Sequence, residues 1–124
     1  MKRDMDVIRR IVLEVEAMDS GHALVSSDGL DEATFAAHAV WMEEAGLIKA
    51  NIQDRLSGGP PKVLIRRLTW AGCEFADAVR SDTLWKKAKD NVMKPSMSFT
   101  FDVLKEWLKT EITQGLPTIR GLGQ

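Results

Sequence analysis

The part of the sequence that most constrains the fold is residues 43–75, EEAGLIKANIQDRLSGGPPKVLIRRLTWAGCEF. Within it, LIKANIQ alternates apolar and polar residues, which is the period of a half-buried strand. KVLIRRL is rich in β-branched residues and indicates a partner strand. SGGPP between them is a turn cluster that continues neither strand. This stretch therefore predicts a β-hairpin, with one helix ending before it and another beginning after it.

Two helices are predicted before the hairpin, because apolar residues recur there at three- and four-residue spacing. The first covers about residues 4–18, with Asp4 as its N-cap. The second covers residues 31–46, with Asp31 near its start and Gly46 placed to end it. The residues expected to face the core are Met5, Ile8, Ile11, Val12, Val15 and Met18, then Phe35, Ala39 and Met42.

Helical spacing returns after the hairpin. Thr69 is expected to cap a helix that opens at Trp70, and Gly72 to allow close approach to the strands. The helical pattern continues to Pro95 with a break near residues 81–82, and TFDVLKEWLKTEI predicts a last amphipathic helix. The inward residues are predicted to be Trp70, Cys73, Ala76, Val79, Trp85, Ala88 and Val92, then Phe101, Leu104, Leu108 and Ile112.

Length and composition indicate one globular domain over residues 1–124, in which residues 95–124 form an appended C-terminal helix and an irregular tail. The single cysteine, Cys73, leaves no internal disulfide and fits a reducing cytoplasm. The charged N-terminal stretch MKRDMDVIRRIVLEVEAM has no apolar segment of the kind found in signal peptides. No apolar run is long enough to cross a membrane, so we expect a cytoplasmic protein without membrane contact.

Charge is distributed unevenly, although the net charge is only −1 and gives no global basic signature. Residues 31–45 hold four acidic residues and no lysine or arginine, whereas residues 47–69 hold five basic residues and one acidic residue. The predicted hairpin is therefore basic, and the helix before it is acidic. A local basic excess of this kind favours contact with phosphates.

The order of elements resembles that of winged-helix regulators of the MarR and PadR kind. In those proteins a Leu-x-x-x-Gly-Leu-Ile phrase ends the recognition helix and Leu-Thr-x-x-Gly follows the wing; EEAGLI and LTWAG correspond to them here, within residues 30–80. The resemblance implies that the hairpin is a wing and that the protein is a homodimer. One feature departs from it, because a winged helix has a further helix where this chain has the short segment GHALVSSDGL. HALVSSDG is predicted either as a short strand and turn or as an irregular loop.

Over nearly the whole chain the sequence resembles a small family of bacterial and prophage proteins that has no assigned activity. Its members open with MKRDMD, a hydrophobic residue and I-R, and carry H…EAGLI, RLTWxGxEFxDAxRxDTxW and FDVLKE. Residues 1–10, 38–48, 67–85 and 101–106 match these phrases. The resemblance implies a cytoplasmic protein linked to phages or prophages.

The basic residues of the predicted wing are the candidate nucleic-acid contacts. A handful of such contacts gives affinity for phosphates that depends on salt and not on base sequence. The alternative is that these are solvated charges on an exposed hairpin. The candidates are Lys49, Arg55, Lys62, Arg66 and Arg67.

The predicted recognition helix offers no Arg, Lys, Asn or Gln with which to read bases. Helical spacing puts Thr34, His38 and Trp41 on its outer, more polar face, and these are the candidate residues for binding a partner protein. The alternative is a structural helix, in which Trp41 packs under a neighbouring element and His38 is half-buried with its hydrogen bonds satisfied. The sequence leaves both alternatives open.

Patterns for catalysis and metal binding are absent from the sequence. His22, His38 and Cys73 are single and widely spaced, without the paired spacing of metal ligands. Cys73 is expected inside an apolar helical stripe, where a thiol is inert. SGGPPK lacks the G-K-[ST] ending of a phosphate-binding loop. We therefore expect no enzymatic activity, no cofactor and no metal.

Together these patterns predict an α+β fold: a winged-helix-like domain with a two- to three-stranded wing and an extra C-terminal amphipathic helix. The predicted function is binding. The protein is expected to be a phage- or prophage-type regulator that contacts nucleic acid, DNA in particular, through its basic wing. The alternative is an interaction module that kept the fold and binds a host or phage protein through its acidic helix.

Overall fold

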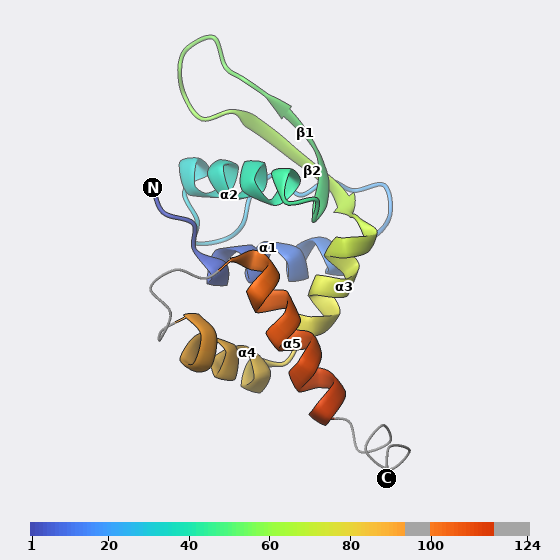
Figure 1. The fold of residues 1–124 in the computed structure, drawn as a ribbon. Helices are drawn as coiled ribbons and strands as arrows, with labels where there is room; N and C mark the ends of the chain where they lie inside the picture. The colour runs from blue at the N-terminus through green and yellow to red at the C-terminus, as the bar shows by residue number, and fades with distance from the viewer. Residues whose placement is uncertain (94–99, 116–124) are drawn as a thin grey trace. The chain divides into compact units, whose positions relative to one another are not determined.

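The computed structural model describes residues 1–93 and 100–115, and the chain divides into two compact units, Met1–Ala76 and Asp77–Gln124. It has a mixed α+β fold, as expected (Figure 1). The predicted helix stop at Pro95 and the predicted irregular tail lie outside the described residues. The elements in chain order are α1 (Met5–Ala17), α2 (Glu32–Glu44), β1 (Ile48–Gln53), β2 (Lys62–Leu68), α3 (Trp70–Val79), α4 (Asp82–Ala88), the π-helical turn η1 (Lys89–Met93) and α5 (Phe101–Gly115).

Helix α1 begins and ends close to where the sequence predicts. Its N-cap is Asp4, whose side chain accepts a hydrogen bond from the backbone N–H of Asp6 at 2.9 Å. The cap satisfies one of the backbone donors that the first turn of a helix leaves free. The predicted stripe of α1 is buried from Met5 to Val15, and Met18 just beyond the helix is half-buried.

Strands β1 and β2 form the predicted antiparallel hairpin. Ile48, Ala50 and Ile52 of β1 alternate with exposed residues, as their spacing predicts. Both α1 and α2 contact the hairpin within the unit Met1–Ala76, and the loop between the strands projects past α2 (Figure 1). The apolar face of the hairpin therefore closes the core over two helices, and its other face is left to solvent.

The segment between α1 and α2 forms neither a helix nor a full strand. Leu24 makes a single antiparallel bridge to Ile65 of β2, with a 2.9 Å N–H···O bond in each direction. The bridge extends the two-stranded sheet by one residue pair, on the edge of β2 away from β1. No helix lies between residues 18 and 31, so the departure from the winged-helix pattern noted in the sequence is real.

The corner where α2 leads into β1 is held by the start of α3. Thr69 caps α3 by accepting from the N–H of Gly72 at 3.0 Å, and its hydroxyl donates to the carbonyl of Gly46 at 2.5 Å. A Cβ atom on Gly72 would lie 2.0 Å from the carbonyl oxygen of Leu47. Only glycine permits this approach, so the predicted role of Gly72 is confirmed.

The inward stripe predicted for α3 is wrong at Trp70 and Cys73 and confirmed at Ala76 and Val79. Trp70 is 82% exposed and Cys73 is also exposed, whereas Phe75 and Ala76 are buried. The physical reason is the close approach at Gly72, which sets the rotation of α3. Positions 72, 75 and 76 then face the core, and positions 70 and 73 face outward. The expectation that Cys73 lies inside an apolar stripe is therefore incorrect.

In the unit Asp77–Gln124, the predicted break lies at Ser81, which caps α4 by accepting from the N–H of Leu84 at 3.2 Å. Helices α4 and α5 contact each other. Leu104 and Leu108 of α5 are buried as predicted. Among residues 1–93 and 100–115, no helix combines the length and apolarity that a membrane crossing needs.

Candidate nucleic-acid interface

A β-bulge near the start of β1 brings two arginines to the same side of the hairpin. Lys49 pairs with Arg67, but the next residue, Ala50, pairs with Ile65. Arg66 is therefore the extra residue of the bulge. In a regular strand two neighbours point to opposite faces, whereas here Arg66 and Arg67 are both exposed. The bulge thus places two arginines beside Lys49, a re-aiming of side chains that bulges commonly produce.

We call the solvent side of the two strands the outer hairpin face. It carries four cationic side chains and two amides, and neither strand contains an aspartate or a glutamate. Apart from the half-buried Leu64, all of its side chains are exposed. The outer hairpin face consists of Lys49, Asn51 and Gln53 from β1, with Lys62, Leu64, Arg66 and Arg67 from β2.

Among the described residues, the cations of this face have no carboxylate partner. The Nε–H of Arg66 donates to Oδ1 of Asn51 at 2.7 Å, and Nη1 of Arg67 donates to the carbonyl of Leu68 at 3.1 Å. Neither acceptor is charged. Within residues 1–93 and 100–115, no carboxylate forms an ion pair with any of the four cations. The face is therefore a concentrated positive surface, suited to attract anions.

Arg55, a further predicted contact, has a different position. It lies in the loop between the strands, and its guanidinium forms an ion pair with Glu32 of α2. Its charge is largely compensated within the chain. The structure therefore groups Lys49, Arg66 and Arg67 closely, puts Lys62 at the far end of the same face, and leaves Arg55 outside it.

The three residues predicted to bind a partner protein do not form an exposed surface. His38 is only 1% exposed, so its expected place on the outer face of α2 is wrong. Its Nε2 accepts from the backbone N–H of Asp4 at 2.9 Å, and its Nδ1 donates to the carbonyl of Thr34 at 2.8 Å. Trp41 is half-buried and packs edge-on against the His38 ring, with 5.1 Å between centroids. His38 thus joins α2 to the start of α1.

The acidic residues of α2 also have partners within the fold. Asp31 caps the helix, and the hydroxyl and backbone N–H of Thr34 donate to its carboxylate at 2.6 and 3.2 Å. These bonds, the side-chain one foremost, hold the pKa of Asp31 below its usual value. Glu32 forms the ion pair described above, and Glu43 accepts from the N–H of Ala50 in β1 at 3.0 Å. Most of the carboxylates of α2 and its N-cap therefore have intramolecular partners.

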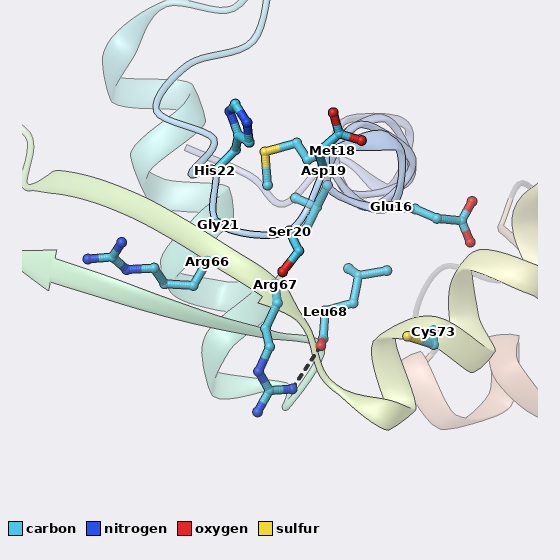
Figure 2. Close-up of a pocket in the computed structure, with 11 residues that line it drawn as sticks. Glu16, Met18, Asp19, Ser20, Gly21, His22, Arg66, Arg67, Leu68 and Cys73 are labelled. Atoms are coloured by element: carbon cyan, nitrogen blue, oxygen red, sulfur yellow. Dashed lines mark hydrogen bonds between the residues drawn. The ribbon is translucent and has the colours of Figure 1, made fainter.

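An open cavity of about 500 Å³ adjoins the bulge, between the end of α1, the end of β2 and the start of α3 (Figure 2). Arg66 and Arg67 line it at their bases, but Figure 2 shows their guanidinium groups extending away from Glu16 on its far side. The exposed Cys73 lies in its wall. In the part of the chain that the structure describes, no three His, Cys, Asp or Glu side chains gather closely enough to hold a metal ion.

Sequence reasoning did not single out two exposed amides of this face, Asn51 and Gln53, or the bulge that organises it. A signal for the bulge exists in KVLIRRL. Its apolar residues are spaced by two from Val63 to Ile65, but by three from Ile65 to Leu68. One added residue in a period of two is what a bulge produces.

Comparison with known proteins identifies relatives by sequence. The model of a family described as "Hypothetical protein (DUF2513)" matches residues 2–98. An "Uncharacterized protein" of Haemophilus influenzae (strain ATCC 51907 / DSM 11121 / KW20 / Rd) is 34% identical over 119 residues, which cover 94% of this chain and 99% of that protein. No solved structure matches the chain.

Proposed function

The chain belongs to the DUF2513 family of hypothetical proteins. We propose that it binds nucleic acid through the outer hairpin face. The observation that carries the proposal is the bulge, which gathers Lys49, Arg66 and Arg67 without a neutralising carboxylate in the part of the chain that the structure describes. Membership of a small bacterial family was expected from the sequence. The likeness to MarR and PadR regulators and the phage linkage remain predictions.

In this proposal the protein is a winged-helix-like regulator of the cytoplasm, not an enzyme. The order of elements supports it: α1, a bridge at Leu24, α2, then the hairpin and α3. Helix-turn-helix proteins join their two helices by three or four residues, whereas residues 18–31 separate α1 from α2 here. The hairpin therefore takes over the role that a recognition helix has in those proteins.

The composition of α2 also supports the proposal that the hairpin, and not this helix, contacts nucleic acid. Its residues 32–44 include no Arg, Lys, Asn or Gln, the side chains that pair best with base edges. Its carboxylates would repel phosphates. The alternative, a partner protein bound on α2, has less support, because His38 is buried and Asp31 and Glu43 are engaged within the fold. A homodimer is proposed from the winged-helix resemblance alone.

The experiment is a fluorescence-anisotropy titration of mixed-sequence duplex DNA at salt concentrations from about 50 to 200 mM. We expect binding that weakens steeply with salt, since each neutralised phosphate adds about −0.9 to the log–log slope. Reversing three charges by Lys49→Glu, Arg66→Glu and Arg67→Glu should abolish binding and leave the thermal unfolding midpoint nearly unchanged, because all three side chains are exposed.

The matched control reverses three exposed charges elsewhere, with Lys2→Glu, Arg3→Glu and Lys109→Glu. It changes the net charge equally, so it should reduce binding only by the general electrostatic effect. Equal losses in the two triple variants would contradict a site on the hairpin. No binding by the unaltered protein at the lowest salt would refute the proposed function altogether.

A further inference from the structure

Resting on the proposed function, we infer that the outer hairpin face lies in the major groove of duplex DNA, and that Arg66, held in place by Asn51, contacts a guanine. The inference adds base recognition to a surface so far assigned only phosphate contacts. It is carried by the hydrogen bond between the two side chains and by the amides that accompany the cations on this face.

Arg66 and Arg67 are neighbours with different restraints. The Nε–H of Arg66 donates to Oδ1 of Asn51 on the adjacent strand at 2.7 Å, and its two terminal nitrogens have no partner among residues 1–93 and 100–115, so they can donate together. Paired donors of arginine match O6 and N7 of guanine, the commonest specific contact in the major groove. Because Asn51 already orders the side chain, less conformational entropy is lost on binding. Arg67 instead donates from Nη1 to the carbonyl of Leu68 at 3.1 Å, so one of its terminal nitrogens is already engaged.

The shape of the outer hairpin face and the spacing of its side chains also fit the major groove of duplex DNA. A two-stranded ribbon can enter the major groove of B-form DNA, which is about 12 Å wide. Asn51 and Gln53 point to the same side of β1 and are about 6.6 Å apart along it, close to the roughly 6.8 Å of two base-pair steps. Gln53 is exposed and is the second candidate for contact with a base. The deep, narrow major groove of A-form RNA does not admit such side chains, so the ligand is DNA.

The test begins with selection of bound duplexes from a pool with a randomised segment, using the full chain. We expect enrichment of sites with a guanine at a defined position. Affinity for an enriched duplex is then compared with affinity for the same duplex changed at that guanine. The unaltered protein should discriminate by roughly 5- to 150-fold, the range for one paired arginine–guanine contact. Arg66→Lys keeps the charge but not the fork of donors, so this ratio should fall towards one.

Asn51 is a positioning residue in this scheme, and it has its own variants. Asn51→Ala removes the acceptor of Arg66 and should lower the discrimination ratio without shifting the thermal midpoint appreciably, because the side chain is exposed. Asn51→Asp keeps a carboxyl oxygen for the Nε–H and should restore the ratio, although the added negative charge weakens binding to every duplex. A merely structural role would not produce this rescue.

Each result decides between the two proposals. Failure of every duplex to bind would overturn the proposed function and this inference together. Binding without a preferred sequence, or a preference that Arg66→Lys leaves intact, would overturn only the inference and leave phosphate binding in place. Equal affinity for A-form RNA duplexes would likewise contradict entry into the major groove. Loss of discrimination in Arg66→Lys, with Arg10→Lys as a control outside the face, would support it.

Discussion

Helix α2 and the outer hairpin face carry charges of opposite sign within the unit Met1–Ala76, and their side chains have different partners. The carboxylates of α2 cap the helix, pair with Arg55 and bind the backbone of β1. The cations of the outer hairpin face bind neutral acceptors or none among the described residues. The carboxylates of α2 therefore stabilise the fold, whereas the cations of the outer hairpin face remain available for a ligand. A charge becomes a candidate contact when the fold leaves it uncompensated, not simply when it is present.

The largest effect should come from Gly72→Ala, at the corner where α2 leads into β1. The new Cβ would lie 2.0 Å from the backbone oxygen of Leu47, which cannot move without disturbing the corner. We expect destabilisation of about 3 kcal/mol or more, measured by urea unfolding. Gly59→Ala in the hairpin loop is the matched control, because nothing lies within 4 Å of the added atom and it should be nearly neutral. Equal stability of the two variants would show that the corner is less rigid than the contact implies.

A smaller effect is expected from His38→Ala in α2. The substitution leaves a cavity and removes the partner of the Asp4 N–H, which together should cost roughly 2–4 kcal/mol of unfolding free energy. Arg66→Ala on the hairpin is exposed and should change that free energy by less than about 0.5 kcal/mol. Similar losses of unfolding free energy in both variants would show that the hairpin side chain also supports the fold.

The smallest effect concerns the pH dependence contributed by Asp31. Hydrogen bonds from Thr34 hold its pKa in the folded protein below the usual 3.8. The carboxylate therefore contributes stability that is fully present above the unfolded-state pKa and is lost as the pH falls through the folded-state pKa. Asp31→Asn also caps a helix but does not titrate. The thermal midpoints of the unaltered protein and of the Asp31→Asn variant should differ little at pH 7. Below about pH 4 the midpoint of the unaltered protein should fall relative to that of the variant. Parallel pH profiles would contradict a stabilising ionised cap.

Much of the local structure was predictable because it depends on neighbours in the chain. The hairpin, the N-cap Asp4, the start of a helix near Asp31, and the close approach at Gly72 were all expected and are confirmed. The rotation of α3 was not, since Trp70 and Cys73 fit an apolar stripe equally well until Gly72 meets the carbonyl of Leu47. Periodicity alone does not distinguish two stripes that differ by one residue.

The order of helices and strands, the turn at SGGPP and the excess of basic residues in the hairpin can be predicted from the sequence, because they follow from periodicity and composition over short windows. Which charges are compensated depends on the folded arrangement. Arg55 forms an ion pair with Glu32, which is distant in the sequence, whereas Arg66 donates a hydrogen bond to the neutral Asn51. The folded arrangement also buries His38, which helical spacing had put on a polar face. Electrostatic pairing and burial depend on distances in space, and those are set when the core closes.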